Sequence, residues 1–271
     1  MTLTSRRRGP VDALLWDVDG TLAETERDGH RVAFNEAFEI EGLPWRWDDR
    51  RYGELLAITG GRERLLHDFG ARADVPTDAA GRERLARHLH QRKNAIYAAI
   101  VASGRIPLRP GVRELMDDCA SAGVAMAITT TTTRASVEAL LERHLGTDWP
   151  SRFATLVCAE DVDRKKPDPA VFSLAVERLG VEPGRAVAIE DSPNGVIAAT
   201  AAGCPVIVTR SVYFADAPMA GALAVGPGLD RRDGWQPSVA DAPARDGRGN
   251  PGGRIGLADL ERWLAAARAG S

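Results

Sequence analysis

The 271-residue sequence lacks the features typical of secreted, membrane and nucleic-acid-binding proteins. Its three cysteines (Cys119, Cys158 and Cys204) stand far apart without the spacing of a metal site, so we expect reduced, buried thiols and a cytoplasmic protein. No apolar run approaches the ~20 residues of a membrane span. With 35 basic and 38 acidic residues the net charge is −3, so no overall positive field attracts the chain to nucleic acid or to a membrane.

Short apolar runs alternate along the chain with segments of helical periodicity. Unbroken runs of this kind suit strands that are buried on both faces. The alternation predicts a doubly wound α/β fold with a parallel sheet. The expected strands are 13–16, 124–128, 155–157, 186–189 and 205–208, and the expected crossover helices are 112–121, 134–145, 169–179 and 194–202.

The segment 26–104 interrupts this alternation. Its apolar residues recur at helical spacing, no run typical of a buried strand is present, and the segment is too long for a loop. We therefore predict an all-helical cap domain at 26–104, inserted into a discontinuous α/β core of 1–25 and 105–271. Within the core, residues 226–256 hold 12 Gly or Pro and predict mostly turn and loop. A last helix follows, with Leu257, Leu260, Trp263 and Leu264 on one face.

Acidic residues follow two of the predicted strands, at the sheet edge where open parallel sheets bind ligands. Asp17 and Asp19 follow the first strand, and Glu190 and Asp191 follow the fourth. Taken alone, Asp17 and Asp19 fit a turn cap as well as a functional site. Four neighbouring carboxylates, however, cannot all stay ionised without a cation. An all-oxygen cluster suits Mg²⁺, whereas Ser192 is expected to be the N-cap of the next helix.

Hydroxyl groups and a lysine complete this edge. In the run Thr129–Thr133 a threonine can cap the next helix, or its hydroxyls and N–H groups can hold a phosphate. Lys165 and Lys166 precede Pro167 in the loop after the third strand. Such lysines are commonly solvated, but only three of the 35 basic residues are lysines, the third being Lys93. This scarcity favours Lys166 as a functional residue.

These motifs, in this order, resemble those of the haloacid dehalogenase superfamily of phosphatases, with its Rossmann-like core. The resemblance rests on DVDGT at 17–21, the hydroxyl of Thr130, Lys166 in KKPDP and EDS at 190–192. It extends over about residues 11–210 and includes a helical cap after the first motif. Within the superfamily, ETERDGHRVAFNEAF (24–38) and YGELLAITGGRER (52–64) look like the CbbY-like proteins, which are similar in build to β-phosphoglucomutases.

The resemblance implies a phosphatase that depends on Mg²⁺. Asp17 would attack phosphorus and form an aspartyl-phosphate, which divides one difficult displacement into two easier ones. The metal would be bound by Asp17, the backbone carbonyl of Asp19, Asp191 and, directly or through water, Glu190.

The same resemblance assigns the remaining catalytic roles. Lys166 would pair with the nucleophile and with the phosphoryl oxygens. Thr130 and the N–H of Thr131 would hold the remaining oxygen. Asp19 would protonate the leaving alkoxide and then deprotonate the attacking water, so it must be protonated during the first step.

The CbbY-like group is associated with dephosphorylation of xylulose-1,5-bisphosphate, a misfire product that inhibits Rubisco in the Calvin cycle. The resemblance therefore implies this small phosphosugar as the substrate. We expect no nucleic-acid or membrane partner, and a monomeric protein.

Substrate choice is expected to come from the cap. We predict that Arg62 binds the distal phosphate, because a guanidinium matches phosphate oxygens, and that Glu24 binds sugar hydroxyls. Tyr52 and His30 lie in segments expected to face the core, although such a histidine is more typical of packing or capping. Arg64 is expected to be a solvated helix charge.

Alternatives stay open at this point. A phosphosugar mutase would use the same Asp17 but pass the phosphoryl group to a second sugar hydroxyl instead of water. A non-catalytic phosphoacceptor or metabolite-binding module would have no use for the complete set of Asp17, Asp19, Lys166 and Asp191. A dehalogenase would not need the second aspartate or the metal cluster.

Overall fold

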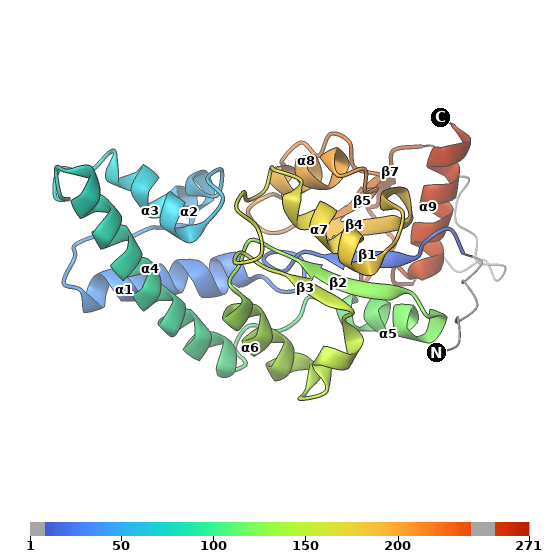
Figure 1. The fold of residues 1–271 in the computed structure, drawn as a ribbon, viewed down its shortest axis with the longest axis horizontal. Helices are drawn as coiled ribbons and strands as arrows, with labels where there is room; N and C mark the ends of the chain where they lie inside the picture. Colours follow the sequence, from blue (N-terminus) through green and yellow to red (C-terminus); the bar gives the residue numbers. More distant parts are fainter. Residues whose placement is uncertain (1–8, 240–252, 271) are drawn as a thin grey trace.

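The core is a seven-stranded sheet in the order β3-β2-β1-β4-β5-β6-β7 (Figure 1). It is seen in a computed structural model that describes residues 9–239 and 253–270. The strands are β1 (Ala13–Trp16), β2 (Ala125–Thr129), β3 (Thr155–Val157), β4 (Ala186–Glu190), β5 (Val206–Thr209), β6 (Ala224–Gly226) and β7 (Gln236–Pro237). All pairings are parallel except that of β6 with β7. The doubly wound parallel fold is therefore confirmed.

The five strands predicted from apolar runs are all present, each within one residue of its expected ends. The strands β6 and β7 were not predicted, because three and two residues carry too little pattern. The strand order reverses at β1, whose neighbours are β2 and β4. In open α/β sheets, ligands bind at such a reversal, beyond the carboxyl ends of the strands.

Helices cover both faces of the sheet. Alternate residues of β1 enter two separate apolar cores, Leu14 and Trp16 on one face and Ala13 and Leu15 on the other. All four side chains are fully buried, which explains why the run is unbroken. The first core is shared with α5 (Val112–Ala122), α6 (Arg134–Leu145) and α9 (Leu257–Ala269), and the second with α7 (Ala170–Leu179) and α8 (Pro193–Ala201).

The chain between β1 and α5 forms a helical insertion, seen on the left of Figure 1. It contains η1 (Glu26–His30), α1 (Arg31–Ile40), α2 (Asp49–Leu55), α3 (Gly61–Phe69) and α4 (Ala79–Ala102). Its own apolar core is built around Phe34, Phe38 and Trp47. Val32 on α1 is 37% exposed and lies outside this core. The domain limits at 26 and 104 stay a prediction.

The two segments that connect the insertion to the sheet pair with each other. Ala23 and Leu108 form an antiparallel bridge, and the N–H of Arg109 donates to the carbonyl of Leu22 at 2.7 Å. This pairing joins the segment after the first motif to the segment that returns from the cap.

The remaining elements agree with their local sequence signals. As predicted, Ser192 caps α8 by accepting from the N–H of Gly195, and Pro193 is the first helical residue. The predicted apolar face of α9 is buried. Short 3₁₀ turns lie at η2 (Trp149–Arg152) and η3 (Pro183–Arg185). Part of the predicted Gly/Pro loop, residues 240–252, lies outside the described residues. None of the described helices is both long and apolar enough to span a membrane.

Candidate active site

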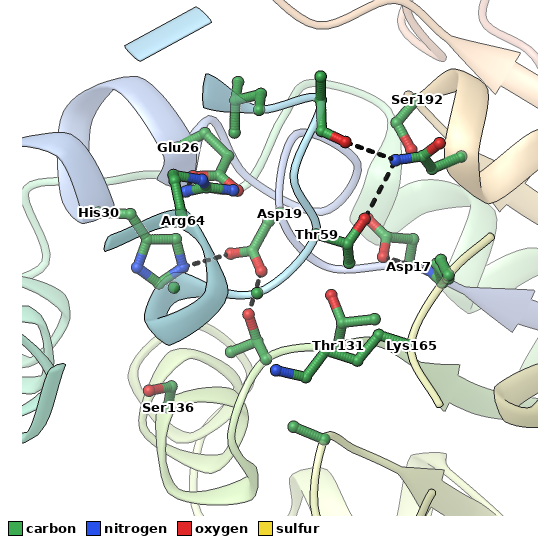
Figure 2. Close-up of a pocket in the computed structure, with 18 of the residues that line it drawn as sticks. Asp17, Asp19, Glu26, His30, Thr59, Arg64, Thr131, Ser136, Lys165 and Ser192 are labelled. Carbon is green, nitrogen blue, oxygen red and sulfur yellow. Dashed lines mark hydrogen bonds and ion pairs between the residues drawn. The ribbon is translucent and has the colours of Figure 1, made fainter. Parts of the chain in front are cut away.

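A pocket of about 350 Å³ lies between the carboxyl ends of the strands and the helical insertion (Figure 2). Both parts of the chain contribute to its lining. The core supplies Asp17, Asp19, Lys165, Lys166, Asp191 and the threonines at 131–133, and the insertion supplies Glu26, His30, Arg64, His90 and Lys93. A molecule bound there would touch catalytic-type carboxylates on one side and cap residues on the other.

Three carboxylates converge at the base of this pocket. One oxygen each from Asp17, Glu190 and Asp191 lies within 4.8 Å of the others, and all three residues are buried. Lys166 Nζ lies 2.7 Å from Asp17 Oδ1 and 2.5 Å from Glu190 Oε1, and it also donates to the carbonyl of Thr129 at 2.9 Å. The structure therefore brings together the acids of the first and fourth motifs with the lysine of the third.

One lysine is not enough to keep these three acids ionised. Burial and the neighbouring Glu190 raise the pKa of Asp17 to about 8, although Lys166 opposes the shift. Burial, Asp17 and Glu190 likewise raise the pKa of Asp191 well above its usual value. A divalent cation would relieve this repulsion, and a set of buried oxygen donors suits Mg²⁺. The residues present therefore fit a magnesium ion.

Two glycines make room for the acids. A Cβ at Gly20 would lie 2.0 Å from Asp191 Oδ2, and one at Gly195 would lie 2.0 Å from Glu190 Oε2. Gly20 also has φ +83°, a conformation that other residues rarely adopt. The glycine of the DVDGT motif thus permits both the turn after β1 and the approach of Asp191.

Asp19 bonds toward the cap instead of joining the carboxylate cluster. Its Oδ1 accepts from Thr25 and lies 3.0 Å from His30 Nε2, while its Oδ2 accepts from Thr132 (Figure 2). Burial alone would raise the pKa of Asp19, but His30 and the two hydroxyls hold it below its usual value. Asp19 is therefore ionised in the free protein, as a base for water requires. The predicted role of Asp19 as an acid would require a proton that arrives with the substrate.

The threonine run is divided between burial and the pocket. Thr130 is buried, and its hydroxyl accepts from the N–H of Thr132 at 3.1 Å. Thr131, Thr132 and Thr133 line the pocket. Thr132, which donates to Asp19, was not singled out from the sequence, because five identical residues offer no pattern to choose between them.

Arg62 and Arg64 on α3 have the reverse of the environments predicted for them. Arg62 is outside the pocket lining, with its side chain 43% exposed and paired to Glu83 at 2.9 Å. Arg64 is buried and lines the pocket, so the prediction of a solvated Arg64 is wrong. The reason is geometric: residues two apart on a helix are separated by about 200° and face opposite sides. The structure therefore does not place Arg62 where it could bind a distal phosphate.

The other predicted cap residues surround Arg64 or lie elsewhere. Arg64 Nη1 donates to the Tyr52 hydroxyl at 2.7 Å, and that hydroxyl donates to Glu26 Oε2. Tyr52 thus lies behind the pocket wall and orients Arg64 and Glu26. Glu24 is not part of the lining, and its carboxylate faces Arg109 Nε at 3.6 Å. Glu26, two residues later, lines the pocket instead.

Lys93 is a pocket residue that the sequence analysis did not select. It lies on α4, only 5% exposed, with Nζ about 5 Å from the ring centres of Phe34 (5.2 Å) and Tyr97 (5.1 Å). Within the part of the chain that the structure describes, its one hydrogen bond, to Asn94, is long at 3.4 Å, and no carboxylate pairs with it. Burial lowers its pKa to about 8. The chain's three lysines all line this pocket, so the scarcity of lysine that favoured Lys166 was a signal for Lys93 as well.

Comparisons with known proteins identify the family of this chain. The model of a hydrolase family, the haloacid dehalogenase-like hydrolases, matches residues 11–203. The chain is 46% identical over 222 residues to the plasmid CbbY protein of Cupriavidus necator, covering 81% of this chain and 86% of that protein. The crystal structure of CbbY from Rhodobacter sphaeroides with phosphate superposes with a TM-score of 0.73 at 39% identity, over 79% of this chain and 93% of that one. A mutant of the same protein, with the same TM-score, identity and coverage, was solved in complex with xylulose-1,5-bisphosphate.

Proposed function

Since the chain belongs to the haloacid dehalogenase-like hydrolases and is a CbbY-like phosphatase, we propose that it removes one phosphate from xylulose-1,5-bisphosphate with Mg²⁺ as cofactor. One observation carries the choice of a bisphosphate. The pocket is lined by Asp17, Asp191 and Lys166 on the core side, and by the buried cations Arg64 and Lys93 on the cap side. Two separate cationic groups in one pocket suit a small molecule with a phosphate at each end.

The reacting phosphate belongs beside the carboxylate cluster. Asp17 attacks phosphorus, the sugar oxygen leaves with the bond electrons, and an aspartyl-phosphate forms. Lys166, already in contact with Asp17, supplies positive charge for the nucleophile and the phosphoryl oxygens. Mg²⁺ held by Asp17, Glu190, Asp191 and the carbonyl of Asp19 would offset the repulsion between the anionic nucleophile and the anionic substrate.

Proton transfer is assigned to Asp19. The substrate phosphate would bring a proton to the Asp19 carboxylate, which passes it to the leaving alkoxide and, ionised again, takes a proton from the water that attacks the aspartyl-phosphate. His30 and Thr132 hold the two oxygens of Asp19 and fix its orientation. We keep Thr130 and the N–H of Thr131 as the groups that hold the remaining phosphoryl oxygen.

The distal phosphate is assigned to Lys93 and Arg64 in place of Arg62. Arg64 is held by Tyr52 and Glu26, and its buried Nε has no hydrogen-bond partner among the described residues. Lys93 has no carboxylate partner among the described residues. Buried cations are normally paired, so Lys93 is suited to an anionic ligand, and Arg64 lines the same pocket beside it. Glu26 takes over the hydroxyl-binding role that the sequence suggested for Glu24.

The setting of the enzyme also belongs to this proposal. A cytoplasmic protein fits three free, buried cysteines, since reduced thiols persist in a reducing compartment. Clearance of xylulose-1,5-bisphosphate would serve the Calvin cycle, and we propose that the enzyme acts as a monomer on this phosphosugar alone.

A substrate panel tests the proposal. Release of free phosphate would be measured for one- and two-phosphate ketopentoses and for glucose phosphates, with Mg²⁺ or with EDTA. We expect xylulose-1,5-bisphosphate to have the highest kcat/KM and EDTA to abolish turnover. A sugar phosphate isomerised without phosphate release, in the presence of a bisphosphate activator, would identify a mutase instead. A preference for monophosphates would refute the bisphosphate assignment.

A further inference from the structure

Arg109 lies where the chain returns from the helical insertion, and backbone carbonyls surround its guanidinium. Nη1 donates to the carbonyls of Gly20 and Thr209, the latter at 3.0 Å, and also to the Thr209 hydroxyl at 3.2 Å. Nη2 donates to the carbonyls of Arg210 at 2.6 Å and Pro227 at 3.2 Å. The side chain is only 11% exposed. One guanidinium therefore joins three segments that are far apart in the sequence.

Two of those segments form the walls around Asp191. Gly20 lies so close that a Cβ there would overlap Asp191 Oδ2. The same Cβ would lie 3.1 Å from Ser211 Cβ, and the Ser211 hydroxyl, next in the chain after Arg210, is a hydrogen-bond partner of the Asp191 carboxylate. Arg109 does not bind this carboxylate itself. It holds the backbone of the two segments that contact it.

We propose that Arg109 is a positioning residue that holds Asp191 in place for metal binding by tying Gly20 to the Thr209–Ser211 segment. This inference rests on the proposed function, in which Asp191 is a ligand of Mg²⁺. Residues that orient metal ligands commonly affect metal affinity by about 10- to 100-fold when they are replaced.

The geometry requires an arginine at this position. Nη1 and Nη2 each donate to two backbone carbonyls, and the two nitrogens lie on different corners of the planar guanidinium. Nε faces Glu24 at 3.6 Å. A lysine carries a single ammonium and cannot reach both sets at once. An Arg109→Lys variant therefore keeps the charge but cannot keep the Nη1 contacts to Gly20 and Thr209 together with the Nη2 contact to Arg210, the residue before Ser211.

Metal binding without substrate tests the proposal. Mn²⁺ would replace Mg²⁺, and its dissociation constant would be measured by electron paramagnetic resonance for wild type, Arg109→Lys and Arg109→Ala, after circular dichroism has compared their folding. The matched control is Arg113→Ala. Arg113 lies in the same surface cleft as Arg109, and among the described residues its side chain donates to the carbonyl of His144. Asp191→Asn reports whether the metal uses the carboxylate cluster.

We expect the Mn²⁺ dissociation constant to rise by about 10- to 100-fold in both Arg109 variants and to stay within twofold of wild type in Arg113→Ala. Methylguanidinium, which can enter the cleft of about 390 Å³ beside residue 109, should restore binding in Arg109→Ala. Loss of thermal stability in Arg109→Lys with unchanged Mn²⁺ affinity would overturn the inference. Equal Mn²⁺ affinity in wild type and Asp191→Asn would instead contradict the proposed function.

Discussion

Replacement of Lys93 by methionine should make the free protein more stable and the enzyme less selective. The lysine is 5% exposed and has no carboxylate partner among the residues described, so its charge is buried at a cost. A pKa lowered from 10.5 to about 8, at about 1.4 kcal/mol per unit, corresponds to about 3 kcal/mol. Methionine fills a similar volume without a charge, so Lys93→Met should raise the free energy of unfolding by up to this amount at neutral pH.

The sign of the pH dependence follows from the lowered pKa. Below about pH 8 the lysine is charged in both the folded and the unfolded state, and the full cost of burying it is present. Between about pH 8 and 10.5 the unfolded chain binds a proton that the folded protein does not, so the wild type gains stability as pH rises. The advantage of Lys93→Met should therefore shrink over this interval.

Although Lys93→Met should stabilise the protein, it should weaken the enzyme's preference for a bisphosphate. A hydrogen bond to a charged group contributes about 1.5–3 kcal/mol, so loss of Lys93 should lower kcat/KM for a bisphosphate by about 10- to 100-fold. The kcat/KM for a monophosphate that lacks the distal group should change little. Urea unfolding and phosphate-release assays measure the two effects on the same preparation.

Arg92→Met is the matched control, because Arg92 is the preceding residue on α4 but is exposed and paired with Glu41. It should change stability by about 0.5 kcal/mol or less and leave both substrates unaffected. Equal losses for bisphosphate and monophosphate in Lys93→Met, or a less stable variant at neutral pH, would refute the assignment of Lys93.

Four further outcomes are expected. Arg64→Gln should raise KM for a bisphosphate by about tenfold, whereas Arg62→Gln should not; a larger effect at Arg62 would restore the sequence-based assignment. Gly20→Ala should lower kcat on the order of 100-fold, because its Cβ would displace Asp191; a normal rate would contradict this packing. Saturating Mg²⁺ at about 100 times its dissociation constant should stabilise the protein by about 2.7 kcal/mol in thermal or urea unfolding, and EDTA should remove the effect; no shift would argue against the metal site. KM for a bisphosphate, measured against pH, should rise by up to about tenfold per unit above pH 8, because phosphate binding needs charged Lys93; a parallel rise for monophosphates would assign the titration to another group.

The sheet and its active edge could be predicted from the sequence because their signals are local. Each central strand is a short apolar run. The functional residues of the core stand at the ends of these strands or in the loop after one of them, namely Asp17, Lys166, Glu190 and Asp191. Parallel topology then brings those ends together whatever the details of packing.

The cap could not be predicted in the same way because its pocket residues depend on helix rotation. The sequence predicted an all-helical segment at 26–104, but it did not show that Arg64 faces the pocket and Arg62 faces Glu83. Lys93 and Glu26 become pocket residues only when α4 and η1 are placed against the core. Such contacts connect distant parts of the chain and leave no local pattern.

The capture of a phosphoryl group by Asp17 can be measured most directly by mass spectrometry. An Asp19→Asn variant given p-nitrophenyl phosphate, whose leaving group needs no acid, should form the aspartyl-phosphate but hydrolyse it slowly. After an acid quench, the peptide that contains Asp17 should carry the mass of one phosphoryl group, and an additional Asp17→Asn substitution should abolish it. A phosphoryl group on another residue, or undiminished turnover of pure Asp17→Asn enzyme, would contradict the account.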